Sequence, residues 1–203
     1  MFDPESRRAW LPKLIVEGVL IVMSILLALA VNQWQDARKD RRLADQALAS
    51  FRQELGRNRM YLRRILPYHE HIRDQFMALD SSGQVHSFDD LRKIQGFEGF
   101  RPAFLLETAW RSALATGALT HVDYPVVNAL STTYTLQERI EDMNRATLPT
   151  MMSGGALADA NAATTARQAG LYLVDICGLE REVLRAYDEM LAILDHPERV
   201  GRR

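Results

Sequence analysis

Cysteine is nearly absent from this 203-residue chain, which has one, at position 177. A single cysteine excludes an intramolecular disulfide framework and gives no indication of the redox state of the compartment. We expect Cys177 to be a small buried residue. An excess of one charge is also lacking, because 25 basic and 26 acidic residues give a net charge of −1. This balance argues against a nucleic-acid partner and marks no acidic or basic ligand.

Motifs for catalysis and for cofactor or metal binding are missing as well. The serines lack the G-x-S-x-G pattern of a nucleophile, and Gly154 and Gly155 are not followed by the Lys-Ser/Thr of a phosphate loop. His69 and His71 would point about 160° apart on a helix, whereas a helical metal pair uses i, i+3 or i, i+4 spacing. We therefore expect no catalytic residue, no metal and no cofactor, and a protein that is not an enzyme.

Strand patterns are absent too, since no run of alternating β-branched residues occurs. The periodicities that are present are helical. They predict an all-α fold in which a single N-terminal transmembrane helix continues into an antiparallel helical bundle. We divide the chain into an N-terminal tail (1–13), a transmembrane helix (14–35), a helical bundle domain (36–196) and a C-terminal tail (197–203).

The transmembrane prediction rests on the apolar run LIVEGVLIVMSILLALAVNQW at 14–34. It has about the 20 residues that a helix needs to cross hydrocarbon. It is longer than the apolar region of a secretory signal and ends in polar residues and charge, so we expect no cleavage. Trp10 and Trp34 bracket the run and are expected to mark the two membrane interfaces, because Trp favours the headgroup level. The predicted location is a bacterial inner membrane, with the lipid bilayer as a partner.

The side of the membrane that holds the soluble domain stays open. Three basic residues precede the span (Arg7, Arg8, Lys13) and five come after it (Arg38, Lys39, Arg41, Arg42, Arg52). By the positive-inside rule this distribution favours a cytoplasmic domain. A bacterial protein with a short basic tail and one N-terminal anchor is, in general, expected to export its soluble domain. The two arguments are nearly balanced, with a slight preference for the periplasm.

Beyond Trp34 the helical pattern continues. Apolar residues recur at steps of three and four: Ala44, Leu48, Phe51, Leu55, Leu62 and Leu66. The anchor and the first soluble helix are therefore predicted to be one nearly continuous helix over 14–66. Pro67 lacks a backbone N–H, so we expect it to end or kink this helix and a shorter helix to come next, over 68–79.

The rest of the chain is also predicted to be helical. Ser87 or Asp89 is expected to cap a short helix that runs through residue 94. Three longer helices are predicted over about 103–116, 124–148 and 156–194. Gly117 suits a left-handed C-cap, and Asp123 suits the N-cap of the next helix.

A stripe of small and polar residues runs along one face of the span. At about 100° per residue, Glu17, Ser24, Ala28 and Gln35 fall within about 40° of one another, with Asn32 close by. Such a stripe permits close helix approach in lipid, so it predicts a transmembrane packing face and either a homo-oligomer or a membrane-protein partner. Glu17 has two other interpretations, an ion site or a carboxylate that meets water about one turn inside the boundary.

The junction VEGVLIVMSILLALAVNQWQDARKDRRL at 16–43 resembles the start of an uncharacterised bacterial family of membrane-anchored helical proteins of unknown function. The match is carried by Glu17 within the span and by Asn32 and Trp34 at its exit. A second stretch, TAWRSALATGAL, also resembles that family. Its matching residues, with one farther on, are Thr108, Trp110, Gly117, Leu119 and Tyr134. The resemblance implies a membrane-anchored architecture and no reaction.

Two functions are compatible with these observations. The first is a membrane-anchored helical scaffold or interaction protein without catalytic activity, which self-associates. The alternative is a single-pass sensor whose bundle binds a small ligand and signals through the anchor helix. A pocket lined by Trp110, Tyr134 and His121 would favour the sensor. A dry bundle core with apolar patches on its outer surface would favour the scaffold. We expect Trp110 and Tyr134 to be core aromatics rather than ligand platforms.

Overall fold

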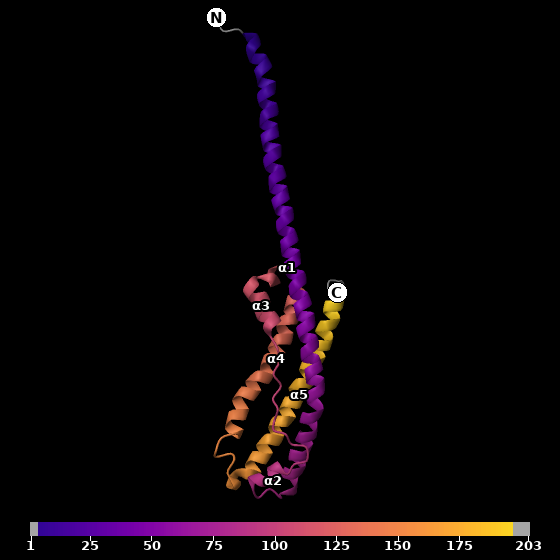
Figure 1. The fold of residues 1–203 in the computed structure, drawn as a ribbon, viewed down its shortest axis with the longest axis vertical. Helices are drawn as coiled ribbons and strands as arrows, with labels where there is room; N and C mark the ends of the chain where they lie inside the picture. Colours follow the sequence, from indigo (N-terminus) through magenta and orange to yellow (C-terminus); the bar gives the residue numbers. More distant parts are fainter. Residues whose placement is uncertain (1–3, 197–203) are drawn as a thin grey trace. The chain divides into compact units, whose positions relative to one another are not determined.

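The computed structural model describes the backbone of residues 4–196 and the side chains of residues 14–196. The described chain is helical without a strand, which confirms the all-α prediction. Figure 1 shows its elements. They are α1 (Pro4–Ser82), α2 (Phe88–Arg92), α3 (Thr108–Thr116), η1 (Ala118–His121), α4 (Tyr124–Met151), η2 (Asp159–Asn161) and α5 (Ala162–Asp195). The chain divides into two compact units, Met1–Gln46 and Ala47–Arg203.

The first unit consists of the N-terminal part of α1. This helix is long and apolar enough to cross a membrane, and the apolar stretch at 14–34 is wholly exposed. No break interrupts α1 at 36–40, so the prediction of one continuous helix over 14–66 is confirmed. Helical residues begin at Pro4, within the stretch assigned to the N-terminal tail. The predicted C-terminal tail at 197–203 lies outside the described residues.

The prediction that Pro67 ends the first helix and that a separate helix comes next over 68–79 was wrong, because α1 continues to Ser82. The alternative, a kink at Pro67, stays a prediction. Pro67 is exposed, whereas Ile65 and His69 on either side are buried. The carbonyl that loses its helical partner therefore faces water, and the buried neighbours hold the helix together. The helix ends only where Gly83 adopts a positive φ of 65°.

The cap residues predicted for the later helices agree with the structure. Gly117 ends α3 with φ 70°, Asp123 precedes α4, and Ser87 precedes α2. The start predicted for the last helix, residue 156, was wrong, because α5 begins at Ala162. The Asn161 side chain donates to the carbonyl oxygen of Gly155 at 2.9 Å and holds the preceding residues in a turn.

In the second unit, residues 47–82 of α1 pack along α5. Surface ion pairs mark the register, and residue numbers on α5 fall as those on α1 rise. The pairs are Arg52 with Asp195, Arg59 and Arg63 with Asp188, Glu70 with Arg181, and Asp80 with Arg167. Such exposed pairs contribute at most about 1 kcal/mol each, so they report the register more than they stabilise it.

The core of this unit lies between α1, α4 and α5, and α4 and α5 are seen side by side in Figure 1. Its largest fully buried side chains include Phe51, Leu55, Leu62, Ile72, Phe76, Leu130, Ile140, Leu173, Ile176 and Tyr187. Each contributes about 1.5–3 kcal/mol by leaving water. Cys177 is also buried, as predicted, and burial raises the pKa of its thiol to about 11. Most residues of the apolar stripes read from the sequence thus form the core, whereas Leu48 and Leu66 are half-buried.

Gly170 shows why a glycine is placed inside α5. A Cβ built on it would lie 3.0 Å from the Met77 Sδ atom and 3.7 Å from Phe76 Cβ. Glycine weakens a helix interior by about 1 kcal/mol relative to Ala. Here it lets α5 approach α1 closely.

Polar side chains inside the core explain why the helix predicted over 103–116 starts five residues late, at Thr108. The buried Asn58 amide donates to the carbonyl oxygen of Leu106 at 2.7 Å and accepts from its N–H at 3.0 Å. The Gln137 side chain also donates to that oxygen, at 3.0 Å. Side chains therefore satisfy this backbone in a non-helical form, which competes with the helix.

The adjacent turn of α1 supports the start of α3. The buried Glu54 carboxylate accepts from the Ala109 N–H at 2.9 Å and from the Tyr134 hydroxyl at 2.8 Å. A carboxylate at a helix N-terminus satisfies an unpaired N–H and interacts favourably with the helix dipole. Burial, together with the hydrogen bond to Glu54, raises the pKa of Tyr134, so the hydroxyl stays protonated and donates.

Asn58→Ala is expected to lower the free energy of unfolding by about 1–3 kcal/mol, since the Leu106 N–H loses its partner and its carbonyl oxygen keeps only the bond from Gln137. The measurement is denaturant unfolding of the full chain in mild detergent. The control is Asn128→Ala on the exposed face of α4, expected within about 0.5 kcal/mol of the parent. Equal losses in both variants would contradict the role of Asn58.

Candidate functional site

A cavity of about 370 Å³ lies within the second unit. Its walls come from α1, α2, the loop at 97–102, the last turn of α4 and the first turns of α5. In Figure 1 this is the end of the unit where α2 lies beside the connection from α4 to α5. The volume is at the lower end of the range for small-molecule sites, about 300–1,000 Å³.

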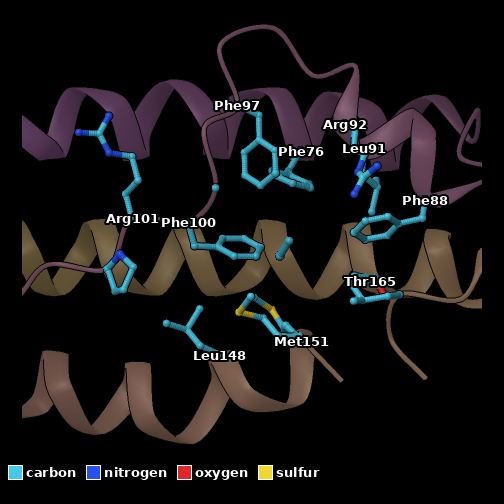
Figure 2. A pocket seen from close by; sticks show the side chains of 15 residues that line it. Phe76, Phe88, Leu91, Arg92, Phe97, Phe100, Arg101, Leu148, Met151 and Thr165 are labelled. Atoms are coloured by element: carbon cyan, nitrogen blue, oxygen red, sulfur yellow. The ribbon is translucent and has the colours of Figure 1, made fainter. Parts of the chain in front are cut away.

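Aromatic rings form one side of the cavity. Figure 2 shows Phe76 of α1 facing Phe97 and Phe100 of the loop, with Leu148 and Met151 of α4 across from them. The Phe97 ring packs edge to face against the Phe76 ring, at a centroid distance of 5.4 Å, and against the Phe100 ring, at 5.6 Å. These geometries are the preferred ones for aromatic pairs and fix the rings in place.

Polar atoms of the walls are turned away from the cavity. The hydroxyl of Tyr68 donates to the carbonyl oxygen of Gly99. The hydroxyl of Thr165 donates to the carbonyl oxygen of Ala156 at 2.7 Å. His69 Nε2 lies 3.1 Å from the carbonyl oxygens of both Phe100 and Arg101. The loop therefore directs its carbonyls toward α1 and its aromatic side chains into the cavity, which leaves an apolar interior.

His69 and Glu180 form a buried pair beneath this loop. Their side chains are 1% and 0% exposed, and His69 Nδ1 lies 2.9 and 3.0 Å from the two Glu180 oxygens. Both ring nitrogens lie within hydrogen-bonding distance of oxygen atoms, Nδ1 of the Glu180 carboxyl group and Nε2 of the loop carbonyls. A buried hydrogen-bonded pair thus links α1, α5 and the loop.

The loop that His69 holds is locally strained. Arg101 has a φ of 47°, in the left-handed region that residues with a side chain rarely adopt. Such a conformation costs of order 1–2 kcal/mol. The two bonds from His69 to neighbouring carbonyls offset this cost, so the pair positions the pocket wall.

Two lining residues are cationic and none is acidic. Arg101 carries its guanidinium over the Tyr68 ring, away from the cavity, and pairs with Glu98 at 2.9 Å. Arg92 lies over the Phe88 ring at 5.7 Å, and within residues 14–196 it makes no ion pair. The pocket therefore has one cation at its rim that is not neutralised.

The nearby Asp90 is committed to the start of α2. Its Oδ2 atom accepts from the backbone N–H groups of His86 at 3.1 Å and Ser87 at 3.0 Å, and from the Ser87 hydroxyl at 3.1 Å. These bonds, led by the one from His86, lower the pKa of Asp90 to about 2. Its other oxygen pairs with Lys93 at 3.3 Å. Asp90 is thus an anion held by partners other than Arg92.

The site residues predicted from the sequence lie elsewhere, in the first unit. Glu17, Ser24, Ala28, Asn32 and Gln35 are all exposed along α1. The Ser24 hydroxyl donates to the Leu20 carbonyl oxygen at 2.8 Å and so is satisfied within its own helix. None of the five lines the pocket, and their role as a packing face stays a prediction.

Of the two predicted interface anchors, Trp10 and Trp34, the structure describes the side chain of Trp34. Trp34 is exposed on α1, and the Arg38 guanidinium lies 4.6 Å from its ring centroid. Trp10 lies outside the residues whose side chains are described. Their role at membrane interfaces stays a prediction.

The pocket is not the one that the sensor hypothesis described. Trp110 stacks on Tyr134 at a centroid distance of 5.3 Å, and both contact the Phe51 ring. They belong to the core near Glu54, and Tyr134 is buried, in agreement with the core interpretation. His121 is exposed in η1. None of these three residues lines the cavity at α2.

The pocket was not predicted from the sequence because its residues come from segments that carry no motif when each is read alone. The glycines and the proline at 96–102 indicate only an irregular link. The signal in that stretch was two phenylalanines, Phe97 and Phe100, in a loop that would otherwise be polar. Among residues 14–196, no group of three or more His, Cys, Asp or Glu side chains has the arrangement to hold a metal ion.

Comparisons of the chain with protein-family models, with curated proteins and with solved structures find no match. The resemblance carried by Glu17, Asn32 and Trp34 therefore stays a prediction.

Glu180→Gln is expected to destabilise the protein by about 1–3 kcal/mol, because the buried His69 ring would lose the carboxyl partner of its Nδ1 atom. Amide hydrogens of the 96–102 loop should also exchange faster. The measurements are denaturant unfolding and hydrogen exchange read by mass spectrometry.

Glu182→Gln is the matched control, since Glu182 lies on another face of α5 and, among the described side chains, forms an ion pair with Arg139 at 3.8 Å. It should change stability by less than about 1 kcal/mol and leave loop exchange unaltered. If Glu180→Gln leaves loop exchange at the parent rate, the pair does not position the loop.

Proposed function

We propose that this protein is a non-catalytic, single-pass protein of a bacterial inner membrane whose antiparallel helical bundle binds a small apolar ligand. The observation that supports it is the cavity at 76–102 and 148–169, with its aromatic and thioether walls. Residues 14–35 would provide the anchor. This is the sensor hypothesis, with the pocket moved to a different place.

The chemistry of the walls favours an apolar ligand. Carbonyls and hydroxyls around the cavity already have partners in the protein, as at Gly99, Phe100 and Thr165. Water in such a space makes few hydrogen bonds, and an apolar molecule displaces it favourably. Met151 and Met152 add flexible, polarisable surface that adapts to ligand shape.

Signalling through the anchor helix extends this proposal. Phe76 lines the pocket and His69 holds its loop, and both residues belong to α1. A ligand that changed the packing around them would act on the same helix that carries the apolar stretch at 14–34. The pocket and the anchor would then be coupled along one element.

A neutral alkyl diazirine is expected to photolabel the pocket of the full chain in lipid nanodiscs. Labelled peptides should cover 88–102 and 148–157, in addition to the lipid-facing stretch at 14–34. Ala169→Leu, which fills the cavity, should remove the pocket label, and Leu157→Trp at its exposed rim should reduce it.

The control is Ala163→Leu, which adds the same bulk at an exposed position of α5. The diazirine should label the pocket of this variant to the same extent as that of the parent. Circular dichroism would confirm that each variant is folded, and the less buried Leu157→Trp guards against loss of fold in Ala169→Leu. Labelling confined to 14–34 in the parent would overturn the proposal.

Self-association through the anchor is a second candidate function. The residues of the predicted packing face are exposed, and the Ser24 hydroxyl is bonded to its own helix. Ser24 and Ala28 therefore present a low surface that another helix can approach closely. Glu17 would gain a neighbouring donor in an oligomer.

Replacing Ser24 and Ala28 together by Leu is expected to weaken association, because added bulk separates the helices without lowering hydrophobicity. The readout is a membrane two-hybrid assay or association in mild detergent. Ile25→Phe with Leu29→Phe, on a different face, should matter much less. If the two double variants behave alike, the stripe is not a homo-oligomer face.

A further inference from the structure

We infer that the ligand of this pocket is a single-chain amphiphile with an anionic head group, its chain inside the cavity and its head at Arg92. The inference rests on the proposed function and names the ligand class. Both a free fatty acid and a single-chain phospholipid have this chemistry.

The cations around the rim differ in whether a carboxylate neutralises them. Arg101 is paired with Glu98, and Lys93 is paired with Asp90. Arg92 lines the cavity, is exposed, and has the Phe88 ring as its neighbour within residues 14–196, with no carboxylate paired to it. Arginine presents a planar set of donors that binds carboxylate and phosphate groups through two parallel bonds.

Asp90 and Asp159, two acidic side chains close to this rim, have other partners. Asp89 lies on the same helix as Arg92 and is exposed, and within residues 14–196 it forms no ion pair with Arg92. Asp90 is occupied by the start of α2, and one oxygen of Asp159 accepts the Phe88 N–H at 2.8 Å. Figure 2 shows Arg92 beside Phe88 and Leu91 at one end of the cavity. A head group placed there would meet the cation while its chain extended toward Phe97 and Phe100.

The apolar interior of the cavity determines the chemistry of the rest of the ligand. An apolar cavity whose wall carbonyls are bonded to Tyr68 and His69 offers no partner to a polar group along the ligand. The ligand's hydrogen-bonding groups must therefore gather at one end. An alkyl chain with a terminal anion meets both conditions.

The test uses the full chain in nanodiscs of zwitterionic lipid, labelled in the pocket by the alkyl diazirine. Three competitors of equal chain length are compared, dodecanoate, dodecanol and dodecyltrimethylammonium, in the parent and in Arg92→Gln. Comparing the two proteins with the same competitor cancels its partitioning into the lipid. Lys93→Gln, which removes a neighbouring charge that does not line the cavity, is the control.

Arg92→Gln is expected to weaken competition by dodecanoate by about three- to fivefold, the size of an exposed charge contact. Competition by dodecanol should stay unchanged, and Lys93→Gln should behave like the parent with all three competitors. Dodecyl phosphate and a lysophospholipid, run in parallel, distinguish a preference for a free acid from one for a lipid head group.

The outcomes separate the inference from the proposed function. If dodecanol competes but Arg92→Gln leaves dodecanoate unaffected, or Lys93→Gln weakens it equally, the inference is overturned and the apolar site stands. If no competitor reduces pocket labelling in the parent, both are overturned. A selective loss for dodecanoate in Arg92→Gln supports both.

Discussion

The polar side chains of His69 and Glu180 are buried between α1 and α5 with almost no contact with water. A buried polar group without a hydrogen-bond partner costs about 1–3 kcal/mol, so each position of such a pair must find a partner. Here the remaining ring nitrogen lies against the carbonyls of Phe100 and Arg101. The pair therefore constrains the two helices and the pocket loop together, since moving any one leaves a buried polar group without its partner.

The pocket is a consequence of this constraint. Because the loop carbonyls are drawn toward α1, its side chains project the other way, and Phe97 and Phe100 complete an apolar wall with Phe76. The strained φ of Arg101 belongs to the same arrangement, since a loop free to relax would have no reason to adopt it. A polar pair that fixes backbone direction thus produces a cavity with an apolar interior.

A second polar group has a similar role farther toward the N-terminus of α1. Glu54 and Asn58 are one helical turn apart and satisfy the start of α3 and the non-helical residues before it. Both interrupt an otherwise apolar stripe that includes Leu55. Buried polar groups of this kind must find all their partners, so they specify where irregular backbone lies.

The sequence by itself determined the helical class, the long first helix, its apolar stretch at 14–34 and the positions of caps such as Gly117. These features depend on composition and on periodicity along one segment. Tertiary structure alone decided that Pro67 is tolerated inside α1, that the residues before Thr108 are non-helical, and that Phe76, Phe97 and Met151 meet around a cavity. Each of these depends on contacts between residues far apart in the chain, and local patterns do not encode which distant side chain will satisfy a given backbone group.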